Sequence, residues 1–263
     1  MDTTTNSNLP SEGYSPRSGN AKASLAPPKR FATASTTARI AAAQFFFLGM
    51  PLSLWGQSYI LSNLFVPQDP VATANNLLSN EFLFRISIIS HLTDTIFFVL
   101  MMLLFYGLLK PVNKFLSRLM LASALAQFPI VFVLEVLHFT ALMILKTDTR
   151  LTFGPAQQQE AAYWLMRIHG YGAGVGMGKL FLGVCFIPFG MLVYRSGFAP
   201  RIIGILLIIG GVGYIADCFT AVLLQRNEYI MVRQFMRYTA LCYIVSLLWF
   251  LVKGVREPRP IAN

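Results

Sequence analysis

The sequence has few charged residues for its length, and this scarcity excludes most classes of soluble protein. Of its 263 residues, 12% are charged and 55% are hydrophobic, and the mean hydropathy is +0.58. A soluble domain carries about 25% charged residues. The composition therefore places the chain in the membrane class. It contains no soluble catalytic domain and no nucleotide-binding motif in its proper structural context.

Cysteine is also scarce. Cys185, Cys218 and Cys242 all lie within apolar runs, and no pair has Cys-x-x-Cys spacing. This pattern argues against a disulfide framework and against a zinc knuckle. We interpret the three thiols as small apolar packing residues.

Six long apolar runs predict an all-α fold, a polytopic transmembrane helix bundle. Each run exceeds the ~20 residues that cross ~30 Å of hydrocarbon as a helix. The predicted spans cover approximately residues 40–64, 82–109, 117–145, 162–194, 202–225 and 230–253. Together they form one transmembrane domain over residues 39–255.

The two ends of the chain are predicted to lie outside this domain. Residues 1–38 are rich in Ser, Thr, Ala, Asn and Pro, and they have too little apolar bulk to fold alone. We interpret them as a disordered basic tail, and residues 256–263 as a short cytoplasmic tail. An organellar transit peptide stays open as an alternative for residues 1–38, because the segment is Ser-rich and has only Asp2 and Glu12 as acids.

The distribution of basic residues predicts the orientation. Thirteen Lys and Arg residues flank the spans on the side that holds both termini, and seven lie on the other side. The positive-inside rule therefore predicts that both termini are cytoplasmic. The net charge of +10 is spread over several short loops. It indicates contact with an anionic lipid bilayer and not with nucleic acid, since no groove-binding motif accompanies it.

Ionisable side chains inside the spans mark the candidate site. A charge in hydrocarbon costs roughly 2.5 kcal/mol or more, so such residues are usually functional. Counted at 1.5 Å per residue, all of them except Lys179, which lies near or past the midplane, fall roughly 10–18 Å below the outer boundary of the membrane. We predict a polar pocket open to the extracytoplasmic side, formed by His91, Asp94, Glu135, His138, His169 and Asp217, with Lys179 and Arg237 as charge partners.

The spacing of these residues predicts how they meet. Ser87, His91 and Asp94 follow an i, i+4, i+7 pattern, which is one helical face. Glu135 and His138, at i and i+3, also share a face. Two such faces on adjacent helices would form a carboxylate–imidazole cluster that can share a proton or bind a cation.

Four interpretations of this polar layer stay open. The charges could only fix helix packing, or they could bind or transfer a small solute, ion or proton. They could also serve an intramembrane enzyme, through acid–base or metal-assisted chemistry. The fourth interpretation is haem held by two of His91, His138 and His169. Because Glu-x-x-His occurs only once, we assign no metal. The cofactor, the substrate and the oligomeric state are not readable from the sequence.

Solute, ion or proton binding is our leading hypothesis, with Asp94 and Asp217 as acceptors and His91 and His169 as their switchable partners. Histidine suits this role because its charge changes near physiological pH.

Several short stretches resemble the domain of unknown function 4386 family, which consists of uncharacterised six-helix bacterial membrane proteins. The resemblance covers roughly residues 38–255. It is carried by Val66-Pro67-Gln68-Asp69-Pro70, Ala74-Asn75-Asn76, Leu83-Phe84-Arg85, Lys110-Pro111-Val112-Asn113, His169 with the glycine run that follows it, the stretch from Tyr194 to Arg201, and Gly213-Tyr214-Ile215-Ala216-Asp217.

The resemblance implies a six-span protein of the bacterial inner membrane, and it implies no activity. It also indicates that Asp94, His169 and Asp217 are family positions. The 38-residue tail departs from the family, whose members usually start close to the first helix. We interpret the glycine run, which has a glycine at every second position from 170 to 178, as a site of close helix packing.

Overall fold

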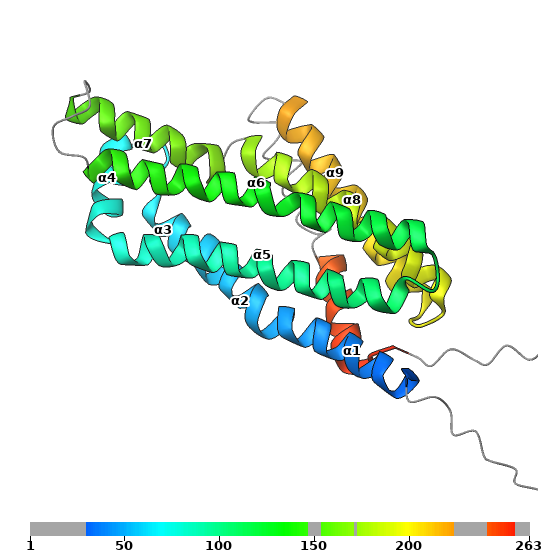
Figure 1. Ribbon diagram of the computed structural model, residues 1–263. Coiled ribbons are helices and arrows are strands. Elements are labelled where there is room, and N and C mark those ends of the chain that lie inside the picture. Colours follow the sequence, from blue (N-terminus) through cyan, green and yellow to red (C-terminus); the bar gives the residue numbers. More distant parts are fainter. Residues whose placement is uncertain (1–29, 147–153, 171–172, 224–240, 256–263) are drawn as a thin grey trace, which may run out of the picture.

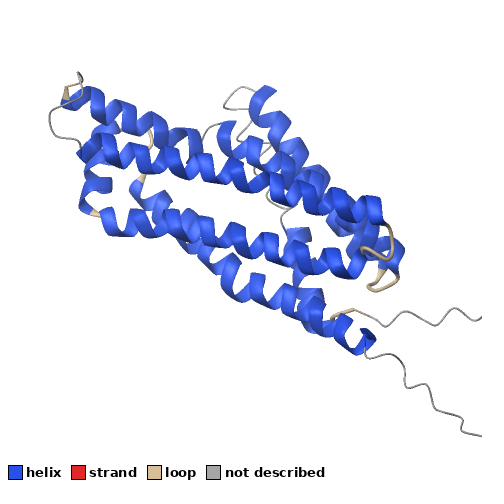
Figure 2. Cartoon of the chain, viewed as in Figure 1, coloured by secondary structure: helices blue, strands red, loops and turns tan. Residues whose placement is uncertain are grey.

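Helices form every regular element that the structure describes, as the apolar runs predict. The structure is a computed structural model, and it describes residues 30–146, 154–170, 173–223 and 241–255 (Figure 1). No strand occurs in these ranges (Figure 2). Five helical segments are long and apolar enough to cross a membrane: Ala34–Leu64, Glu81–Leu109, Lys114–Lys146, Lys179–Ser196 and Arg201–Thr220. The chain is thus a multi-pass membrane protein.

The count of six spans stays a prediction. A shorter apolar helix, Leu241–Lys253, lies within the predicted sixth span, but the first part of that span lies outside the described residues. The predicted fourth span, 162–194, corresponds to two helices, α7 (Pro155–Gly170) and α8 (Ala173–Ser196), which lie on either side of residues 171–172. The glycine-rich sequence around this point has low helix propensity.

The long helices α5 (Glu81–Leu109) and α6 (Lys114–Lys146) form an antiparallel pair along the length of the bundle (Figure 1). The turn between them is short because Asn113 caps α6, with its side-chain oxygen accepting from the Leu116 amide at 3.0 Å. At the far end, Lys146 and Arg85 both bind the carboxylate of Glu81 at 2.8 Å. These contacts hold the two helices in register at both ends.

The first span is not a regular α-helix. It runs through α1 (Arg30–Gln44), η1 (Phe45–Gly49), α2 (Met50–Ser53), η2 (Leu54–Leu61) and α3 (Ser62–Leu64), in which η1 and η2 are π-helical. Pro51 lies between the two π-helical turns and has no amide hydrogen to donate. Such turns are rare and often occur at functional sites.

Two remaining helices complete the described fold. A short helix, α4 (Pro70–Ser79), starts at Asp69, whose carboxylate accepts from the Ala72 amide at 2.8 Å. The hydroxyl of Tyr163 in α7 accepts from the Gln68 amide at 2.9 Å, which ties this loop to α7. Helix α9 (Arg201–Leu223) follows α8 after a short turn in which Gly197 has a φ of +67°.

The buried apolar side chains form two separate clusters. One lies around Phe98, Met120, Phe186, Leu207 and Phe250. The other lies around Leu77, Phe84, Leu142, Tyr163 and Met166. Along α5 and α6, His91, Asp94, Glu135 and His138 fall between the two clusters. The bundle therefore has a polar band between two apolar cores.

Candidate functional site

A buried carboxylate joins two histidines at the centre of the polar band. Glu135 in α6 is 3% exposed, and its two oxygens face different rings. Oε1 lies 2.5 Å from Nδ1 of His91 in α5, and Oε2 lies 3.1 Å from Nδ1 of His138, one turn along α6. The ring of Phe84 packs edge-on against His138 at 5.9 Å between centroids. The spacing of these residues places the three side chains on facing surfaces of α5 and α6.

The triad of His91, Glu135 and His138 can take up and release a proton. An ionised Glu135 accepts from Nδ1–H of both rings, which fixes the tautomer and turns each Nε2 away from the carboxylate. One additional proton on either ring changes the triad from net negative to neutral. A group that alternates between these two states inside an apolar bundle is suited to proton transfer.

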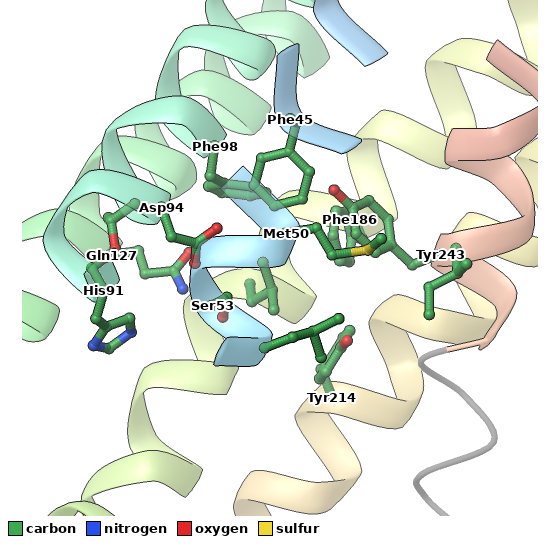
Figure 3. A pocket seen from close by; sticks show the side chains of 14 residues that line it. Phe45, Met50, Ser53, His91, Asp94, Phe98, Gln127, Phe186, Tyr214 and Tyr243 are labelled. Atoms are coloured by element: carbon green, nitrogen blue, oxygen red, sulfur yellow. Dashed lines mark hydrogen bonds between the residues drawn. The ribbon is translucent and has the colours of Figure 1, made fainter. Parts of the chain in front are cut away.

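Asp94 lies one turn beyond His91 on α5, but it faces a cavity instead of the triad. The cavity has a volume of about 290 Å³ and lies between the first span, α5, α6, α8, α9 and the C-terminal helix. Figure 3 shows His91, Asp94 and Gln127 on one side of it, and Phe186, Tyr214 and Tyr243 on the other. The cavity thus has one polar wall and one aromatic wall.

The polar wall contains two buried acceptors without a partner. Neither Oδ1 of Asp94 nor Oε1 of Gln127 has a hydrogen-bond partner among the described residues. Ser53 of α2 lines the cavity together with Asp94. The chain leaves space here because Gly49 faces Asp94, and a Cβ added at Gly49 would lie 3.2 Å from Oδ1.

The aromatic wall is rigid because its rings pack on one another. Phe186 of α8 stacks on Tyr243 of the C-terminal helix with centroids 4.7 Å apart and an interplanar angle of 28°. Phe186 also packs against Tyr214 of α9 at 5.9 Å. Phe45 and Phe98 continue the ring network toward Asp94, with their centroids 5.9 Å apart.

Asp217 lies apart from the triad and binds a different partner. Its carboxylate forms an ion pair with Lys179, which joins α9 to α8. Asp217 is 4% exposed, so the pair is almost fully removed from solvent on the carboxylate side. Lys179 is the charge partner that the sequence predicts for this layer.

Five of the six predicted residues are therefore distributed over three places. His91, Glu135 and His138 meet in the triad, Asp94 and His91 line the cavity, and Asp217 pairs with Lys179. The backbone of His169 belongs to α7, while its side chain lies outside the description. Arg237 lies outside the described residues. Within the described part of the chain, no group of three or more His, Cys, Asp or Glu side chains has a metal-binding arrangement.

Sequence reasoning missed several cavity residues. Gln127 is a lone amide in an apolar run, and this signal could have identified it. Phe186, Tyr214 and Tyr243 gave no such signal, because aromatic residues are common in membrane helices and only tertiary packing brings these three together. Ser53 was also missed, since serine is frequent at helix contacts in membranes.

Comparisons with known proteins agree with the resemblance seen in the sequence. The family model described as "Domain of unknown function (DUF4386)" matches residues 41–254. An "Uncharacterized protein" of Archaeoglobus fulgidus is 32% identical over 78 residues. That match covers 30% of this chain and 44% of the relative, so the chain spans less than half of the length of that protein. No solved structure matches the chain.

Proposed function

Since the chain belongs to the DUF4386 family and is a multi-pass membrane protein, we propose that it binds and transfers a small solute in exchange for, or together with, a proton. The solute occupies the cavity beside Asp94, and the triad of His91, Glu135 and His138 holds the proton. The location that we propose is the bacterial inner membrane, with both termini in the cytoplasm and the cavity facing the extracytoplasmic side.

The observation that supports this function is the double role of His91. Its ring lines the cavity, while its Nδ1 contacts the carboxylate of Glu135. A proton that enters the triad therefore changes the charge on the cavity wall. Conversely, a solute beside Asp94 changes the electrostatic environment of His91, three residues away. Binding and protonation are linked in this way through one side chain.

The first span, with its two π-helical turns, is the part of the bundle that moves during the proposed transfer of the solute. Phe45, Met50, Ser53 and Leu54 line the cavity from this span, on both sides of Pro51. A span with π-helical turns and an internal proline bends more readily than a regular helix. Rotation of this segment against α5 would open the cavity, while the α5–α6 pair keeps the triad in place.

A binding measurement tests the solute site. The full chain in lipid nanodiscs is dialysed against three probes of similar size: benzylamine, benzyl alcohol and phenylacetate. We expect saturable binding of at least one probe above that of empty nanodiscs, and its loss in Leu182→Phe, which fills the cavity. Saturable binding of none of the three, or binding that Leu182→Phe leaves unchanged, would contradict a solute site in this cavity.

Proton coupling is measured on the same samples with a pH-indicator dye in weak buffer. Addition of the bound probe should release or take up protons in the wild-type protein. Glu135→Gln keeps the shape of the side chain but removes its charge, so it should abolish this signal while binding persists. An unchanged proton signal in Glu135→Gln would exclude the triad as the proton site.

A further inference from the structure

We infer that the solute class of this cavity is a protonated amine with a small apolar body, an assignment that rests on the function proposed above. Three features of the cavity support it independently: the hydrogen-bonding character of its polar wall, the charge of its lining and the apolar character of its opposite wall.

The polar wall requires a hydrogen-bond donor. Oδ1 of Asp94 and Oε1 of Gln127 are both acceptors, both are buried, and neither has a partner among the described residues. A buried acceptor without a donor costs free energy, so a ligand that supplies N–H groups removes this cost when it binds. An ammonium group carries three donors and no acceptor, so its hydrogen-bonding character matches a wall of two acceptors.

The charge of the lining selects a cation. Asp94 is the carboxylate of the wall, and no Lys or Arg occurs among the described residues that line the cavity. Lys179, on the neighbouring turn of α8, is already bound to Asp217. An anionic solute would therefore meet the Asp94 carboxylate, and the one histidine of the lining, His91, already contacts the carboxylate of Glu135. An ammonium group would instead neutralise Asp94.

The opposite wall selects an apolar body. Phe186, Tyr214 and Tyr243 present a continuous aromatic surface across the cavity from Asp94 (Figure 3). The volume of about 290 Å³ is sufficient for one ring and an amine head, since an engineered cavity of ~150 Å³ in another protein already binds benzene. Phe45 and Phe98 also line the cavity and could stabilise the cation through their ring faces.

The test compares the same three probes on the full chain in nanodiscs. Benzylamine should bind at one site per chain, and benzyl alcohol and phenylacetate should bind at least about thirtyfold more weakly. Asp94→Asn should weaken benzylamine binding by about thirtyfold or more, because it removes the buried negative charge. Glu160→Gln, which neutralises an exposed carboxylate of α7 outside the cavity, is the matched control and should bind as the wild type does.

Two further variants keep the inference testable if Asp94→Asn does not fold. Gln127→Leu replaces an unpartnered amide with an apolar group, and it should lower benzylamine affinity roughly threefold to tenfold. Tyr243→Leu should lower affinity, while Tyr243→Phe, which keeps the ring, should not. Equal affinities of Tyr243→Leu and the wild type would overturn the assignment of the aromatic wall.

The outcomes separate this inference from the function on which it rests. Preferred binding of phenylacetate or benzyl alcohol, still lost in Leu182→Phe, would overturn the amine assignment and leave the solute site intact. Saturable binding of none of the probes would overturn both. Benzylamine binding that Asp94→Asn and Gln127→Leu leave unchanged would overturn the amine site at the polar wall.

Discussion

Glycine residues lie at two helix contacts in this protein, and they have opposite consequences. Between α8 and α9, a Cβ on Gly183 or on Gly190 would lie 2.6 Å from a carbonyl oxygen, that of Gly211 or Gly204 respectively. Where the first span faces α5, a Cβ on Gly49 would lie 3.2 Å from Oδ1 of Asp94 on α5 and 2.8 Å from the ring of Phe45 on the same span. The first contact is backbone against backbone, and the second is backbone against side chains.

This difference separates a fixed part of the bundle from an adaptable part. Backbone atoms cannot move aside without displacing a whole helix, so α8 and α9 behave as one rigid hairpin. Side chains can rotate, so the contact at Gly49 tolerates change and leaves room for a carboxylate. The cavity lies where these two parts meet, with Phe186 and Tyr214 of its aromatic wall on the rigid hairpin and four of its lining residues on the first span.

The largest expected effect on stability comes from the ion pair in the rigid hairpin. Lys179→Met leaves the carboxylate of Asp217 buried without its cation, and removing one partner of a buried pair costs about 3–5 kcal/mol. Because Lys179 is 25% exposed, we expect a smaller loss, about 2–3 kcal/mol. Thermal unfolding in detergent measures this loss. The double variant Lys179→Met with Asp217→Leu should recover part of it, and no recovery would show that the charge imbalance is not the cause.

Gly190→Ala tests the backbone contact itself. The added methyl group would lie 2.6 Å from the Gly204 carbonyl oxygen, so α8 and α9 must separate. Overpacking of this kind costs typically 1–3 kcal/mol, seen as a lower unfolding temperature. Gly107→Ala in α5 is the control, because nothing lies within 4 Å of its Cβ position. It should leave the protein as stable or slightly more so, since alanine is the better helix former. Equal unfolding temperatures of Gly190→Ala and Gly107→Ala would show that the backbone contact at Gly190 does not limit how closely α8 and α9 pack.

Gly49→Ala should have the smallest effect on stability and a clear effect on binding. Its methyl group meets the Phe45 ring and the Asp94 carboxylate, both of which can shift, so we expect a loss below about 1 kcal/mol. The displaced carboxylate should weaken benzylamine binding in the dialysis assay. A large fall in unfolding temperature with unchanged binding would show that Gly49 serves packing and not the cavity.

Much of the fold was predictable because apolar length and helix-end signals are local. Helices begin at Asp69-Pro70 and at Asn113 in the structure, because the Asp69 and Asn113 side chains each accept a hydrogen bond from an amide of the first turn. The family resemblance is confirmed by the match over residues 41–254. The meeting of His91 with Glu135 follows from spacing on two adjacent antiparallel helices. The sequence could not reveal that Asp94 and His91 face different groups, since a rotation of a few tens of degrees decides which neighbour each contacts.

The glycines that make the close contacts between helices were harder to predict. The sequence predicts close packing at the run from Gly170 to Gly178, because a glycine recurs at every second position, but the contacts of this run lie outside the described side chains. The close backbone contacts between α8 and α9 involve Gly183, Gly190, Gly204 and Gly211, which are spaced seven residues apart in each helix. Two turns of helix separate such residues, so they lie on one face, but the pattern appears only when both helices are compared.

The polar triad is built from α5 and α6 alone, and this affects when it can form during synthesis. Residues up to His138 supply all three side chains, whereas the aromatic wall needs Phe186, Tyr214 and Tyr243. As the ribosome delivers the chain from its amino end, the second and third hydrophobic segments can hydrogen-bond three of their own ionisable groups to one another upon insertion. The nascent hairpin thus enters lipid with its triad already formed, and the later segments assemble onto it.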